Sequence, residues 1–167
     1  MLKVPGSPAG ISLSTRKNRP IPNEKPDDER PTDLLLAAAT NAIARVPGDI
    51  AIRSLSSCYN CMGMMFACRR TSIDVSELDM IIEDDGYRTI EEGELKIGDI
   101  VVYSRDGVEA SHVAQVVALL VDPNVADPIR VLSKWGVDGG EYFHPMRQVS
   151  EAYGVPFSFL TDRPVMQ

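Results

Sequence analysis

A change of hydrophobic period at Gly86 constrains the fold of this chain more than any other feature. Before Gly86, apolar residues recur with helical spacing, whereas after it they alternate or form continuous β-branched runs. Residues 100–103, 111–120 and 129–135 each predict a strand, and Asp-Gly at 106–107 is typical of a hairpin turn. The sequence therefore predicts an α+β fold, with helices packed on a small antiparallel sheet.

Two helices are expected before the sheet. Residues 34–45 carry Leu and Ala nearly all the way round, which predicts a largely buried helix. A second, amphipathic helix begins at Ser72 or Asp74 and ends at the acidic run 83–85. We expect that run to be a solvated helix end rather than a metal site, because adjacent helical residues point in different directions.

Shorter segments complete the expected fold. Residues 49–55 form a connection with some strand character, and residues 87–90 a short strand. Residues 141–145 predict an edge strand that Pro145 stops. The last segment, residues 146–167, contains a possible helical turn and is expected to pack on the core without carrying chemistry.

The first 30 residues differ in composition from the rest. They contain five prolines among Ser, Asn, Lys and Asp, and they have few apolar side chains to bury. Such a segment cannot offset its ordering entropy alone, so residues 1–30 are expected to be a flexible tail or an extended arm. Residues 31–167 are expected to form a single domain.

The charge and the cysteines restrict partners and compartment. A net charge of −7 argues against nucleic acid or an anionic membrane surface as the main partner. No apolar run is long enough to span a membrane, and the N-terminus lacks a secretory signal core. Three cysteines clustered between Cys58 and Cys68 do not suggest a disulfide framework. We expect a cytoplasmic protein, or one exported without a classical signal.

Cys61 is the candidate nucleophile. Asn60 is a good N-cap, and Cys61 would lie in the first turn of a helix, where unpaired backbone N–H groups stabilise a thiolate. The alternative is an inert buried cysteine, because Met64, Met65 and Cys68 continue with helical spacing.

Cys58 and Cys61 also form a C-x-x-C pair, which suggests two other roles. A zinc site would need two further ligands, and no second pair of ligands exists, so no metal or cofactor is expected. A thioredoxin-like redox pair would need strands that the preceding segment does not predict.

His112 is the candidate general base. It is one of two histidines and begins a long predicted strand, from which an imidazole can be aimed at a helix terminus. The alternative is an exposed histidine at the end of a strand.

Three motifs in order resemble the NlpC-type cysteine peptidases of the papain-like superfamily. Asn60-Cys61-Met62-Gly63 is similar to the family's Asp-Cys-Ser-Gly nucleophile motif. The runs at 98–103 (Gly-Asp-Ile-Val-Val-Tyr) and 111–116 (Ser-His-Val-Ala-Gln-Val) are similar to its Gly-Asp and His-Val strands. The resemblance covers residues 50–136 and implies a divergent member with an NlpC-type fold.

The resemblance implies roles for particular residues. Cys61 is the implied nucleophile and His112 the implied base, and a third polar residue on the next strand would orient the imidazole. On that strand only Ser133 or Lys134 is available, with His144 and Asp99 as substitutes from elsewhere.

The residues beside the implied catalytic pair are expected to shape the substrate groove. These are Tyr59, Asn60, Met62 and Trp135. The backbone N–H of Cys61 would hold the oxyanion, and Tyr59 is a candidate second donor. For Tyr59, packing of the helix start is an equally weighted alternative, and for Trp135 a place in the core or the groove wall is favoured over catalysis.

The predicted function is hydrolysis of peptides or other amides through a Cys61 thioester, with bacterial cell-wall peptides among the substrates. With an amine as acceptor, the same chemistry gives an acyltransferase or transamidase acting as an effector. The competing hypothesis is a catalytically silent binding module on the same scaffold, because fold alone does not establish activity.

Overall fold

Nine strands and three α-helices make up the computed structural model, which describes residues 10–25 and 28–164. Part of the expected arm, at residues 1–9 and 26–27, lies outside the described residues. In chain order the elements are β1 (Asn23–Glu24), α1 (Thr32–Ile43), β2 (Ala51–Leu55), α2 (Cys61–Phe66), β3 (Ser72–Ile73), η1 (Val75–Glu77), α3 (Leu78–Asp85), β4 (Arg88–Ile90), η2 (Glu92–Glu94), β5 (Ile100–Ser104), β6 (Ala110–Leu119), β7 (Ile129–Lys134), β8 (Gly140–Pro145), η3 (Glu151–Tyr153) and β9 (Val155–Thr161).

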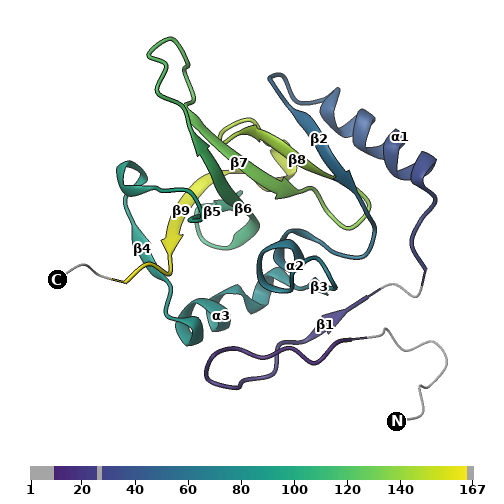
Figure 1. Cartoon of the computed structure of the whole chain (residues 1–167), viewed down its shortest axis with the longest axis vertical. Coiled ribbons are helices and arrows are strands. Elements are labelled where there is room, and N and C mark those ends of the chain that lie inside the picture. Colours follow the sequence, from purple (N-terminus) through teal and green to yellow (C-terminus); the bar gives the residue numbers. More distant parts are fainter. Residues whose placement is uncertain (1–9, 26–27, 165–167) are drawn as a thin grey trace.

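One antiparallel sheet of seven strands organises the molecule, in the order β2-β8-β7-β6-β5-β9-β4 (Figure 1). The α+β class predicted from the change of period is therefore confirmed. Strands β5, β6 and β7 lie at the centre, and they are the three segments whose β-branched runs were clearest in the sequence.

Two hydrophobic clusters cover the two faces of the sheet. Because successive strand residues point to opposite faces, Val101 and Ala114 lie in one cluster, and Val102 and Val113 lie in the other. Helix α1 covers the first face near β2 and β8, whereas α2 packs on the second face against β6 and β7. Each face of the central strands is thus buried, which explains their continuous apolar character.

Three expectations about the elements are wrong. Helix α1 is not largely buried, because Leu35 and Ala39 face the sheet while Leu34 and Leu36 are exposed. The segment ending at Pro145 is an interior strand, because β2 pairs with its outer side. The tail supplies β9, which lies between β5 and β4, so it completes the sheet instead of only packing on it.

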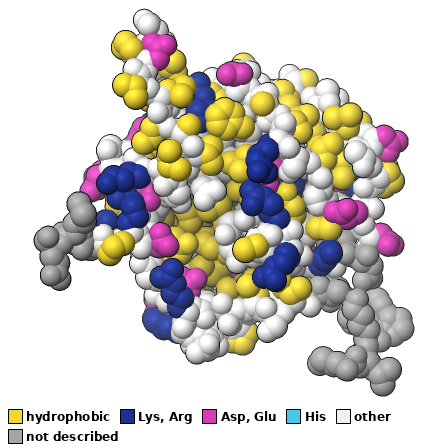
Figure 2. Space-filling model, in the orientation of Figure 1, with side chains coloured by type: hydrophobic (Ala, Val, Ile, Leu, Met, Phe, Trp, Pro, Cys, Tyr) yellow, Lys and Arg dark blue, Asp and Glu magenta, His cyan; other side chains and the backbone are white. Residues whose placement is uncertain are grey.

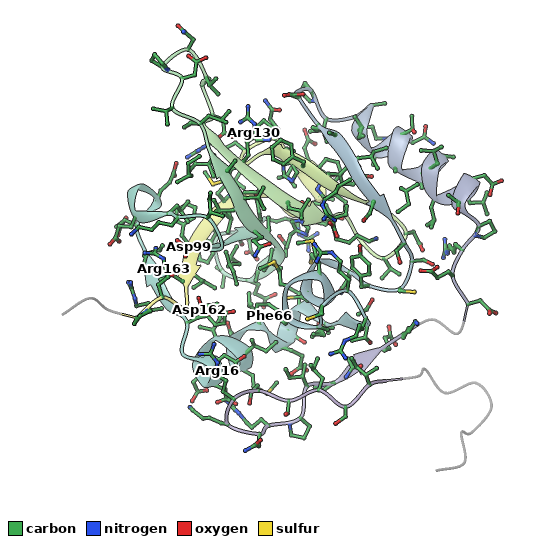
Figure 3. All side chains as sticks on the ribbon, in the orientation of Figure 1. Arg16, Phe66, Asp99, Arg130, Asp162 and Arg163 are labelled. Carbon is green, nitrogen blue, oxygen red and sulfur yellow. The ribbon has the colours of Figure 1, made fainter. Side chains whose placement is uncertain are left out.

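The described part of the N-terminal segment is an extended arm that runs along α2 and α3 (Figure 1). Strand β1 of the arm pairs with β3, and Ile21 is buried in the cluster that contains α2 and α3. The arm also approaches the residue that follows β9. A guanidinium nitrogen of Arg16 lies 3.6 Å from a carboxylate oxygen of Asp162 (Figure 3).

Asp84 anchors the arm. Its burial differs from the expectation that the acidic run 83–85 is a solvated helix end. The Arg19 guanidinium donates to both oxygens of this carboxylate, and the hydroxyl of Thr15 donates to it at 2.7 Å. These bonds hold the pKa of Asp84 well below its usual range. Asp84 is buried because the arm, a segment distant in sequence, lies over it.

Candidate active site

Cys61 is the first residue of α2, as the sequence predicts. The Asn60 side chain caps this helix by accepting from the backbone N–H of Gly63 at 2.9 Å. The same side chain bonds both backbone groups of Ile73, with its nitrogen 2.6 Å from the carbonyl oxygen. Asn60 therefore fixes the start of α2 against β3, which holds the Cys61 backbone in place.

The Cys61 thiol is buried, with 8% of the residue exposed. Burial raises the pKa of the thiol, while hydrogen bonds from the backbone of Val113 and Met62 and the charge of Lys134 oppose that rise. Val113 lies on β6 before the stretch that pairs with β7, which begins at Gln115. The sulfur thus lies beside the beginning of β6, on the side where β7 does not yet pair with it, as a neutral thiol at neutral pH.

His112 is adjacent to Val113 on β6, but its ring lies on the opposite face of the strand. It is fully buried, stacks on the Tyr153 ring with centroids 4.2 Å apart, and lies 5.5 Å from the Tyr103 ring. Neither ring nitrogen has a hydrogen-bond partner among the described residues. Burial lowers the pKa of His112 to about 3. Neither histidine is visible on the face drawn in Figure 2.

The expected hydrogen bond between thiol and imidazole is therefore not formed. The structure brings Cys61 next to the backbone of the residue that follows His112, and it keeps the ring on Tyr153. The alternation of side chains along β6 causes this separation, because Val113 faces α2 and His112 faces away. His112 is not the exposed strand-end histidine of the alternative interpretation either, since it is completely buried.

Neither Ser133 nor Lys134 orients the imidazole of His112. The Ser133 hydroxyl is bonded to His144 Nε2 at 2.8 Å and accepts from the Trp135 indole at 2.9 Å. The Lys134 ammonium donates to the backbone carbonyls of the turn that follows β7, those of Gly136, Val137 and Gly139. Both residues lie on the strand that the sequence predicts, whereas their partners follow from tertiary contacts.

The two substitutes proposed for the orienting role are also occupied. The Asp99 carboxylate accepts from the Arg163 guanidinium at 2.7 and 3.1 Å, and Figure 3 shows these two residues together near the end of β9. His144 is bonded to Ser133 and to the carbonyl of Pro145. Burial lowers the pKa of His144 to about 4, so this histidine is neutral as well.

Of the four expected groove residues, Asn60 lines a hollow on the surface. Met62 is fully buried, and Trp135 is buried with its indole N–H bonded to Ser133. The Tyr59 hydroxyl donates to Glu141 at 2.9 Å, so it does not face the thiol as an oxyanion donor. These three side chains belong to the core beneath the site.

Two groups near the site escaped prediction. Tyr153 comes from the tail that was expected to carry no chemistry, and its ring covers the imidazole of His112. Glu141 is fully buried, and its carboxylate accepts hydrogen bonds of 2.8 to 3.1 Å from Arg53, Arg69 and Tyr59. For the second group, the signal in the sequence is a carboxylate inside a predicted strand.

Cys58 has a hydrogen-bond partner in the arm. Its thiol donates to Glu29 at 2.9 Å, and all three cysteines are free thiols. Among residues 10–25 and 28–164, no group of three or more His, Cys, Asp or Glu could hold a metal ion. Within the same residues, no helix is long and apolar enough to cross a membrane.

Comparisons with protein-family models, curated proteins and solved structures found no match to this chain.

Proposed function

We propose that this chain is a thiol-dependent hydrolase of peptides or other amides, with Cys61 as the nucleophile and His112 as the general base. One observation carries the proposal: on the strand against which the Cys61 helix packs, the fully buried imidazole of His112 has two ring nitrogens without a hydrogen-bond partner among the described residues. Leaving a buried polar group unsatisfied costs about 1–3 kcal/mol. Such a cost is common where the group acts in chemistry.

In the proposed reaction, a ring nitrogen of His112 takes the proton from the Cys61 sulfur, and the thiolate attacks the amide carbonyl carbon. The C–N bond then breaks, the amine leaves with the proton from the imidazole, and the acyl group stays on sulfur as a thioester. Water adds to this thioester while His112 moves a proton from the water to the departing sulfur. The products are an amine and a carboxylic acid, and the thiol is restored.

The oxyanion needs donors, and the site offers two kinds. Backbone N–H groups at the start of α2 lie beside the sulfur, and the buried ammonium of Lys134 supplies a positive charge nearby. The nucleophile forms during the reaction, because burial raises the pKa of Cys61 and lowers that of His112, which keeps both neutral at rest. The proposal requires the imidazole to leave Tyr153 and to approach the sulfur at the start of β6, on the side where β7 does not yet pair.

Acetylation by p-nitrophenyl acetate tests the proposal with a probe small enough to enter the site. We expect a thioester on Cys61, mapped by mass spectrometry, that water slowly releases. Cys61→Ser should abolish this adduct, and His112→Gln should slow its formation by about 100-fold, as loss of a general base does. The exposed thiol of Cys68 is the internal reference for ordinary reactivity. Acetylation of Cys68 alone, or of Cys61 at equal rates with and without His112, would overturn the proposal.

The same neutral pair favours a second candidate, a binding module without catalysis. A thiol with a raised pKa and an imidazole with a lowered pKa are each less reactive than in an ion pair. This candidate predicts that Cys61 stays unmodified in the folded chain and reacts only after denaturation.

If acetylated Cys61 passes its acyl group to added glycine methyl ester faster than to water, the chain is instead a transferase.

A further inference from the structure

Two hollows lie on the surface near the start of α2 and the start of β6. The first has a volume of about 360 Å³ and lies between β1 of the arm and the start of α2, where Asn60 lines it. The second has a volume of about 460 Å³ and is lined by η1 and by Ala110 at the start of β6. Asp74 lines both hollows, so they adjoin. Together, called the acidic cleft below, they run from the residue before Cys61 to within two residues of His112.

The charges that line the acidic cleft have one sign. Glu24 and Asp74 line the first hollow, and Asp74, Asp79 and Glu109 line the second. The lining residues include no Lys or Arg. Within residues 10–25 and 28–164, none of these four carboxylates forms an ion pair. Four uncompensated carboxylates along a concave surface concentrate negative potential there.

An independent observation at the first hollow indicates a ligand. Ser72 lines it, is 6% exposed, and its hydroxyl has no hydrogen-bond partner among the described residues. The neighbouring side chain of Asn60 uses its oxygen and nitrogen on Gly63 and Ile73, so it does not satisfy that hydroxyl. A backbone amide or an ammonium group in the hollow would provide the missing partner.

We propose that the acidic cleft binds an extended polypeptide segment that carries Lys or Arg side chains. This inference deepens the proposed function and rests on it for the bond to be cleaved, because it names the substrate class. A chain lying along both hollows would pass from Asn60, the residue before Cys61, to Ala110 at the start of β6, and so would bring an internal amide bond near the proposed pair. Its cationic side chains would meet Glu24 on one side and Glu109 on the other.

Binding to the Cys61→Ala chain tests the cleft independently of thiol chemistry. The probe is a fluorescein-labelled 12-residue peptide of alternating Lys and Ser, followed by fluorescence anisotropy at low salt. We expect it to bind, and a peptide with Glu in place of Lys to show at least ten-fold weaker binding. Removal of two exposed charges by Glu24→Gln with Glu109→Gln should weaken binding of the Lys peptide by about ten-fold.

A matched control removes the same net charge elsewhere. Asp33→Asn with Glu151→Gln alters two exposed carboxylates outside the cleft, so binding should change less than two-fold. Equal weakening in the control, or equal binding of the Glu peptide, would overturn the proposal. Displacement of the peptide by an equal concentration of spermine would show a polyamine site instead. Peptide binding without acetylation of Cys61 would refute the proposed hydrolase but not the peptide site in the acidic cleft. Acetylation of Cys61 without peptide binding would refute the peptide site alone.

Discussion

Lys134 is the residue whose environment says most about the site. Its ammonium is fully buried, donates to three backbone carbonyls and lies 5.3 Å from the centroid of the Tyr59 ring. No carboxylate within the described residues forms an ion pair with it, and burial lowers the pKa of Lys134 to about 8. A buried cation held by neutral dipoles is available to stabilise an anion that forms nearby, such as the Cys61 thiolate.

Removing this charge should make the thiol a weaker acid. In Lys134→Gln, which keeps a hydrogen-bond donor, the midpoint of the pH profile for acetylation of Cys61 should move to higher pH. At pH 7.5 the rate should fall by about ten-fold. Lys96→Met, which removes an exposed charge, is the control and should leave the profile unchanged. An unchanged midpoint in a folded Lys134→Gln chain would show that the lysine has a structural role only.

At the scale of single elements, α2 depends on a glycine. A Cβ on Gly63 would lie 1.7 Å from the backbone oxygen of Thr71, much closer than any real contact. The absence of a side chain there allows α2 to approach the strand that precedes η1, and so places Cys61 against β6.

Substitution of this glycine should be costly. We expect Gly63→Ala to lower the free energy of unfolding by about 3 kcal/mol, because backbone must move to admit the methyl group. Gly93→Ala provides the control, since its Cβ would meet nothing within 4 Å and the free energy should change by less than about 0.5 kcal/mol. Urea unfolding of both variants measures the difference. Equal stability of the two would contradict the close approach of α2 to Thr71.

At the scale of the whole molecule, the two buried histidines make stability depend on pH. Burial lowers the pKa of His112 to about 3 and that of His144 to about 4, whereas unfolded histidine titrates near 6.5. Between these values the unfolded chain binds more protons than the folded chain, so stability is present above pH 6.5 and is lost as pH falls.

The expected loss is large enough to measure. Lowering the pH from 7 to 5 should reduce the free energy of unfolding by about 2 kcal/mol for each buried histidine. His112→Gln should remove about half of this dependence, and urea unfolding at a series of pH values would show it. If wild type and variant have the same slope, the imidazole of His112 is accessible to solvent protons.

The sequence alone determined the class of the fold and the place of Cys61 at the start of a helix, because both follow from local patterns. The change of period at Gly86 predicts the central strands β5, β6 and β7, and the N-cap at Asn60 predicts where α2 begins. Side-chain and backbone preferences within a few residues suffice for such features.

Only the tertiary structure decided what surrounds Cys61 and His112, because those contacts join segments distant in sequence. Strand β2 makes the strand ending at Pro145 interior, the tail brings Tyr153 onto His112, and the arm buries Asp84. The face that His112 occupies depends on strand register, since a shift of one residue reverses every side chain. The partners of Ser133 and Lys134 likewise depend on how β7 packs and turns, which no local pattern records.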